Sequence, residues 1–220
     1  DTVRTYYPDL YGRVLQKAKE GQFMPEGGFY VECDTNIPCG ESLIRQLTYG
    51  KRWFRSVFGV ETELAWLPDS FGFSAALPQI LAGCGIRYFA TQKLLRCLPE
   101  CDPFPYNIFL WEGLDGTRIL SHIYFENNSA VDPGLLNRRW NRDRHQQEDI
   151  DTFLYPFGFG DGGGGATRDL VELARRVKDL EGAPRTRMDS PVAFFRDIER
   201  KGLPENRYVG ELYLQWHRGT

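Results

Sequence analysis

The sequence has 220 residues, with 27 Lys and Arg against 30 Asp and Glu, so its net charge at pH 7 is −3. A nearly balanced chain without a basic block gives no indication of binding to nucleic acid or to an anionic membrane surface. No apolar run approaches the roughly 20 residues that a helix needs to cross a bilayer.

Segments with helical spacing of apolar residues alternate along the chain with short strand-like runs. Helices are predicted, in chain order, at residues 10–22, 41–58, 74–82, 133–147, 167–180 and 191–201. Strands are predicted at residues 29–33, 63–67, 87–92, 153–157, 185–188 and 207–214. A hairpin is predicted from residues 108–112 and 118–124, around the turn Asp115-Gly116.

This alternation predicts an α/β fold with a parallel sheet, either open or closed into a barrel. The chain begins just before a helix that has no preceding strand, and it ends directly after a strand. We therefore expect an internal piece of a larger enzyme, with residues 1–220 as part of one catalytic domain.

The most informative motif runs from Trp66 to Gly72 and carries Asp69 between a predicted strand and a predicted helix. In α/β folds, residues at such a position face the site at the carboxyl edge of the sheet. The alternative is an Asp that only caps the following helix.

Two further residues follow predicted strands in the same way. Asp161 lies in the glycine-rich loop 158–165, where the backbone lets a ligand approach closely. The loop lacks the Lys-Ser/Thr of a P-loop and does not fit a dinucleotide-binding fingerprint. His217 follows the last strand, whereas His122 is expected to be a packing residue and His145 a surface residue.

The five cysteines, an odd number in a chain of this length, do not predict a disulfide framework. They also lack the two close pairs of a structural zinc site. Reduced thiols in a cytoplasmic protein are the expectation.

Two carboxylates at one edge of a sheet suit glycoside hydrolysis, in which one attacks the anomeric carbon and the other protonates the leaving oxygen. A carboxylate together with an imidazole also suits a divalent ion such as Zn²⁺. Several segments in order then resemble glycoside hydrolase family 38, the retaining α-mannosidases, especially their cytosolic and bacterial branch. These segments are residues 28–32, 40–46, 66–72, 74–80, 91–93, 109–113, 157–165 and 210–217.

The resemblance implies a distorted seven-stranded parallel β/α barrel, here without its first strand or strands. It implies that Asp69 is the nucleophile and also a metal ligand, that His217 is a second metal ligand, and that Asp161 is the general acid/base. Lys93 matches a basic residue near the nucleophile, and we expect it to bind substrate. Trp111 is expected either to bind substrate or to belong to the core.

The implied substrate is a mannose-containing oligosaccharide such as an N-glycan, and the implied cofactor is zinc, with cobalt or another divalent ion as alternatives. Downstream helical and β-rich domains and a homo-oligomer are expected for the full-length protein. The family has two further metal ligands in a His-x-Asp pair, which this sequence lacks, so we expect the chain alone to be inactive. The alternatives are a metal-dependent deacetylase of polysaccharides and a non-catalytic carbohydrate-binding domain.

Overall fold

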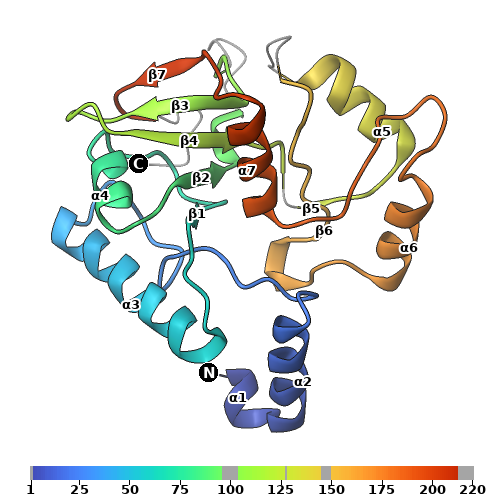
Figure 1. Cartoon of the computed structure of the whole chain (residues 1–220), viewed down its shortest axis with the longest axis horizontal. Helices are drawn as coiled ribbons and strands as arrows, with labels where there is room; N and C mark the ends of the chain where they lie inside the picture. Colours follow the sequence, from blue (N-terminus) through green and yellow to red (C-terminus); the bar gives the residue numbers. More distant parts are fainter. Residues whose placement is uncertain (1, 96–103, 127, 145–149, 213–220) are drawn as a thin grey trace.

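A computed structural model describes residues 2–95, 104–126, 128–144 and 150–212. The chain forms a mixed α/β fold around one five-stranded sheet with the strand order β1-β2-β4-β3-β7 (Figure 1). The strands are β1 (Leu64–Trp66), β2 (Tyr88–Thr91), β3 (Ile108–Glu112), β4 (Arg118–Ile123) and β7 (Arg207–Val209). β1, β2 and β4 run parallel, so their carboxyl ends meet at one edge of the sheet.

The predicted hairpin is confirmed as β3 and β4, which pair antiparallel, and β7 runs parallel to β3. Its turn contains Asp115, whose carboxylate accepts hydrogen bonds from the backbone N–H of Thr117 at 3.0 Å and from its hydroxyl at 2.6 Å. Gly116 follows with a φ of 83°, a conformation that side chains disfavour. Local turn chemistry therefore fixes this part of the sheet.

Helices cover both faces of the sheet (Figure 1). α3 (Gly40–Phe58) and α4 (Leu77–Gly83) pack on one face, and α7 (Pro191–Lys201) packs on the other. Adjacent strand residues alternate between the two cores, as the two-residue period of a strand requires. Phe89 of β2 belongs to the α3–α4 side, whereas the preceding Tyr88 stacks on Phe195 of α7 with ring centroids 4.9 Å apart.

The helix ends follow from the sequence. α3 ends at Gly59, which adopts a left-handed φ of 70° and donates its N–H to the carbonyl of Arg55 at 3.0 Å. α7 begins after Ser190, whose hydroxyl accepts a hydrogen bond from Ala193 N at 3.0 Å, with Pro191 in the first turn. Both helices agree with the predicted ranges.

The remaining elements form a smaller unit beside the sheet and a helical pair below it (Figure 1). The smaller unit contains β5 (Asn128–Ser129), α5 (Pro133–Arg138), the π-helix η2 (Arg139–Asp143), β6 (Gly158–Phe159), the 3₁₀ turn η3 (Asp161–Gly163) and α6 (Arg168–Arg176). β5 and β6 pair antiparallel in a separate two-stranded sheet. α1 (Thr2–Tyr6) and α2 (Pro8–Lys19) precede the sheet in sequence, and the short 3₁₀ helix η1 (Lys93–Leu95) follows β2.

Three predicted strands are wrong. In place of a strand at 29–33 the chain makes one isolated parallel bridge, from Gly27 to Ala65, because Gly28 turns the backbone with a φ of 73°. Residues 153–157 pair with no strand, and residues 185–188 are also irregular. The described residues thus form an open sheet of five strands, and the closed seven-stranded barrel is not confirmed.

Cys33, Cys39 and Cys84 are free thiols, while Cys97 and Cys101 lie outside the described residues. In the described part of the chain, no helix is long and apolar enough to cross a membrane.

Candidate active site at the carboxyl edge of the sheet

Asp69 lies just beyond β1, on a loop that is fastened to a second loop at residues 32–36. The hydroxyl of Ser70 donates to the carbonyl of Cys33 at 2.9 Å, and the hydroxyl of Thr35 donates to the carbonyl of Gly72 at 2.8 Å. Gly72 has a φ of 99°, which allows the sharp turn after the aspartate. These bonds hold the Asp69 backbone in one place.

The end of β2 supplies two donors to Asp69. The ammonium of Lys93 lies 2.8 Å from Asp69 Oδ1, and the amide of Gln92 donates to the same oxygen at 3.0 Å. The Lys93 side chain is 17% exposed and that of Asp69 is 45% exposed, so the carboxylate is held from the protein side and open to solvent. Within the described residues, the second oxygen, Oδ2, has no hydrogen-bond partner.

Two residues for which the sequence predicts no role also lie here. The carboxylate of Glu32 accepts a hydrogen bond from the backbone N–H of Asp69. Burial, and then the nearby charge of Asp69, raise the pKa of Glu32. Glu32 belongs to a segment that resembles the family, but no spacing in the sequence connects it to a residue 37 positions later.

The second is Tyr124, which directly follows β4. Its ring is fully buried and stacks on Trp66 with centroids 4.9 Å apart, and its hydroxyl has no hydrogen-bond partner in the part of the chain that the structure describes. Burial raises the pKa of Tyr124, and the charges of Glu32 and Asp69 raise it further. The ends of β1, β2 and β4 therefore bring an acid, a cation and a phenol together.

The other predicted site residues are Asp161, His217 and Trp111. Asp161 is exposed in η3, next to Gly162 and Gly163 with φ values of 70° and 73°. Among the described residues, it makes no hydrogen bond or ion pair with Asp69. His217, with the rest of the predicted final strand beyond 212, lies outside the described residues.

Trp111 is a core residue. Its side chain is fully buried among aromatic rings, with the ring of Phe89 at 5.1 Å, and its indole N–H donates to the carbonyl of Gly210 at 2.7 Å. Of the two alternatives that the sequence left open, this arrangement agrees with the core, because the indole has no surface on which to bind a sugar.

The described residues do not form a complete metal site. They contain no cluster of three His, Cys, Asp or Glu side chains arranged to hold an ion. Asp69 is the one predicted ligand among them, and one of its oxygens is already bound by Lys93 and Gln92. A tightly held zinc ion needs three or four protein ligands, so this set does not fit the ion without ligands from elsewhere.

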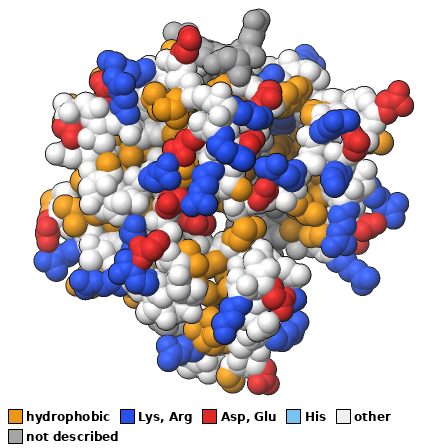
Figure 2. Space-filling view, in the orientation of Figure 1, with side chains coloured by type: hydrophobic (Ala, Val, Ile, Leu, Met, Phe, Trp, Pro, Cys, Tyr) orange, Lys and Arg blue, Asp and Glu red, His pale blue; other side chains and the backbone are white. Residues whose placement is uncertain are grey.

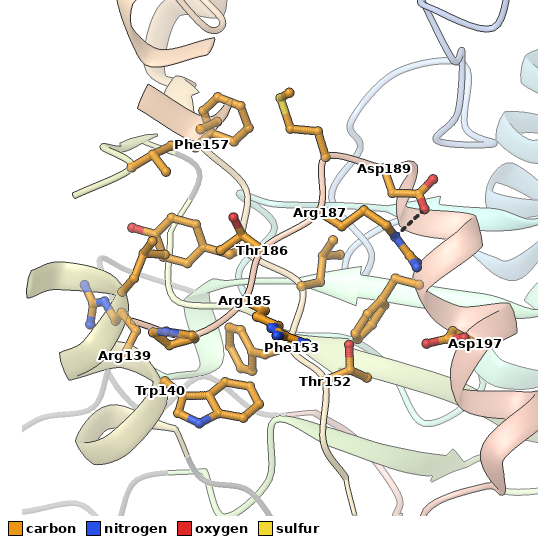
Figure 3. A pocket seen from close by; sticks show the side chains of 18 of the residues that line it. Arg139, Trp140, Thr152, Phe153, Phe157, Arg185, Thr186, Arg187, Asp189 and Asp197 are labelled. Atoms are coloured by element: carbon orange, nitrogen blue, oxygen red, sulfur yellow. Dashed lines mark ion pairs between the residues drawn. The ribbon is translucent and has the colours of Figure 1, made fainter. Parts of the chain in front are cut away.

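A cavity of about 640 Å³ lies between α7 and the smaller unit. Figure 3 shows its lining, which includes Arg139 and Trp140 of η2 and the ion pair of Arg187 with Asp189 at 2.8 Å. None of the predicted site residues that the structure describes lines it. The cavity therefore gives no reason to place the candidate active site away from the carboxyl edge of the sheet.

Surface charge is mixed on the face shown in Figure 2, where basic and acidic side chains are interspersed. Ion pairs between basic and acidic side chains also form in the described part of the chain, including Arg87 with Glu199 at 2.8 Å and Arg196 with Glu63 at 2.7 Å. This face thus carries no continuous field of one sign that would attract a polyanion.

Comparison with known proteins gives consistent results. Alpha-mannosidase 2C1 of Homo sapiens is 42% identical over 99% of this chain, and alpha-mannosidase G of Dictyostelium discoideum is 40% identical over 97%. The chain covers 21% and 20% of these relatives, so it spans about a fifth of their length.

A solved alpha-mannosidase from Enterococcus faecalis V583 superposes with a TM-score of 0.76 at 18% identity, covering 96% of this chain and 24% of that one. This likeness shows a shared fold. The sequence also matches the N-terminal domain of the glycosyl hydrolases family 38 over residues 3–218. With that match spanning nearly the whole chain, the protein belongs to glycosyl hydrolase family 38.

Proposed function

We propose that this chain forms part of the catalytic domain of a retaining α-mannosidase that removes terminal α-linked mannose from oligosaccharides. The observation that carries the proposal is Asp69, held through one oxygen by Lys93 and Gln92 at a solvent-open edge, with its other oxygen unpaired among the residues described. The α-mannosidase names of relatives that align with almost the whole chain support the same reaction.

In the proposed reaction, Asp69 Oδ2 forms a bond to the anomeric carbon while the bond from that carbon to the leaving oxygen breaks. Asp161 gives its proton to the leaving oxygen, and then takes a proton from the water that displaces Asp69. Lys93 and Gln92 orient the carboxylate and stabilise its charge before the attack. The assignment of Asp161 rests on the resemblance of its glycine-rich loop to the family.

Zinc is the proposed cofactor, with cobalt or another divalent ion as alternatives. Asp69 and His217 are its proposed ligands in this chain, and the further ligands would come from outside it. We also propose that the complete domain closes into the seven-stranded barrel of the family, in a cytoplasmic protein with further helical and β-rich domains that assembles into a homo-oligomer. The sheet order and the shared fold support an α/β domain of this kind.

The test is hydrolysis of 4-nitrophenyl α-mannoside by the full-length gene product, with added Zn²⁺ or Co²⁺, beside the variant Asp69→Ala. We expect hydrolysis that depends on the ion and is lost in the variant. Activity that survives Asp69→Ala would refute the assigned nucleophile.

A second measurement separates the reaction from metal-dependent deacetylation. A fluorinated mannosyl substrate should leave a stable glycosyl group on Asp69, which peptide mass spectrometry detects. A deacetylase forms no glycosyl-enzyme, and a carbohydrate-binding domain would bind mannosides without hydrolysing them. Either of those results would overturn the proposed function.

A further inference from the structure

Glu32 occupies an unusual position beside the proposed nucleophile. One of its carboxylate oxygens accepts the backbone N–H of Asp69, and its side chain is exposed. Among the described residues, its other oxygen, Oε2, has no partner. Glu32 thus combines a fixed oxygen toward the protein with a free oxygen toward solvent.

The loop that carries Glu32 is rigidly built. Asp34 accepts hydrogen bonds from the backbone N–H groups of Asn36 at 2.8 Å and Ile37 at 2.9 Å. The bonds from Ser70 to Cys33 and from Thr35 to Gly72 connect the same loop to the Asp69 loop. Glu32 is therefore held relative to Asp69 by contacts that do not involve its own side chain.

The charges do not explain Glu32 as a structural ion pair. Lys93 pairs with Asp69, and Glu32 has no ion-pair partner within the described ranges. A second carboxylate beside the first is electrostatically unfavourable. If Glu32 served only to accept one backbone N–H, a neutral side chain such as Gln could do the same without the repulsion between two carboxylates.

A second observation concerns a buried polar group near these carboxylates. Among the described residues, the buried hydroxyl of Tyr124 has no hydrogen-bond partner, and the charges of Glu32 and Asp69 add to the effect of burial in raising its pKa. Buried polar groups are paired in the great majority of cases, so an unpaired one calls for an explanation. A polar ligand bound at the Glu32–Asp69 edge supplies an explanation, because it would change the solvation and hydrogen bonding of the Tyr124 hydroxyl.

We propose that Glu32 Oε2 accepts a hydrogen bond from the hydroxyl on the carbon next to the anomeric carbon of the bound sugar. This inference rests on the proposed function, because it places the anomeric carbon at Asp69. A carboxylate beside the nucleophile is adjacent to that hydroxyl, whose hydrogen bonds strengthen as the oxocarbenium-like transition state forms. Glu32 is then a substrate-binding residue as well as a support for the Asp69 backbone.

The experiment measures kcat/KM of the full-length gene product on 4-nitrophenyl α-mannoside and on its 2-deoxy analogue. The variant is Glu32→Gln, which keeps the shape and an amide oxygen for Asp69 N–H but removes the charge. We expect kcat/KM on the mannoside to fall about 10- to 100-fold, the range for losing a hydrogen bond to a charged acceptor. On the 2-deoxy analogue, which has no hydroxyl to bind, we expect a change of less than about threefold.

Asp34→Ala is the matched control, since it loosens the same loop without touching the site. It should change kcat/KM on both substrates by the same factor. If Glu32→Gln also lowers kcat/KM on the mannoside and on its 2-deoxy analogue by the same factor, Glu32 only supports the Asp69 backbone and the proposal is overturned. If the wild-type protein hydrolyses neither substrate, the proposed function fails and this inference fails with it, a result distinct from a loss confined to the variant.

Discussion

His122 should make the stability of this protein fall in mild acid. Its imidazole is fully buried between Phe153 and Phe194, whose ring centroids lie 4.8 and 5.1 Å away, and its Nε2 accepts a hydrogen bond from Leu154 N at 3.2 Å. Burial lowers the pKa of His122 from 6.5 to about 3. Protonation would bury a charge and remove the acceptor for Leu154.

The direction of the effect follows from where the proton binds. Below pH 6.5 the unfolded chain takes up a proton at His122, whereas the folded chain does not until about pH 3. Stability is therefore lost as the pH falls through this window. At pH 5, which is 1.5 units below the unfolded pKa, the loss is about 2 kcal/mol at 1.36 kcal/mol per unit.

The assay is equilibrium unfolding in urea at pH 7 and pH 5, for the wild-type chain and for His122→Gln. The amide oxygen of Gln can accept from Leu154 N and does not titrate. We expect the wild type to lose about 2 kcal/mol more than the variant between the two pH values, because other groups contribute equally to both. An equal loss of unfolding free energy in both proteins would contradict a buried His122 that stays uncharged in the folded protein at pH 5.

Three further outcomes are expected. Burial, and then a neighbouring carboxylate, raise the pKa of Glu26 to about 7 from 4.5, so its contribution to stability is lost as the pH rises through that window. Glu26→Gln should therefore raise the urea midpoint of unfolding at pH 8 but not at pH 4. Gly50→Ala should lower the free energy of unfolding by about 2 kcal/mol despite its better helix propensity, because the new Cβ would lie 2.2 Å from the carbonyl oxygen of Gly28. The control is Gly12→Ala, which should not destabilise the chain because no atom lies within 4 Å of its new Cβ. Lys93→Met should lower kcat/KM on 4-nitrophenyl α-mannoside at least tenfold without a matching loss of thermal stability, and unchanged kinetics would contradict the orienting role proposed for the ion pair.

The helices α3 and α7 could be predicted because their signals are local. The α3 range follows from apolar spacing and the Gly59 end, and α7 begins at Ser190-Pro191 as the capping rules require. The strand at 153–157 could not be excluded in this way, because a strand depends on a distant partner. Its Leu154 N–H is used by the His122 imidazole instead of a neighbouring strand.

The site shows the same division between local and distant information. Asp69 lies three residues after β1 and Lys93 two residues after β2. Parallel strands bring such residues to one edge, so their meeting follows from the predicted topology. Glu32 lies in a segment predicted as a strand, where its side chain would have pointed to one face of a sheet. It reaches Asp69 only because that segment is a loop fastened by Ser70 and Thr35, which no periodicity encodes.

The charges at this edge fit the proposed reaction. Asp69 and Glu32 are both carboxylates, and Lys93 is the one cation paired with either of them in the described part of the chain. Without a bound ion these three side chains carry one more negative than positive charge, and the proposed divalent ion on Asp69 would reverse that balance. Glu32 would still hold a negative charge beside the anomeric carbon, where positive charge develops, so the transition state gains more from it than the ground state does. A carboxylate can bind a neutral sugar through its hydroxyls, but only the developing positive charge also gains from the charge of Glu32, and catalysis therefore explains this residue better than recognition alone.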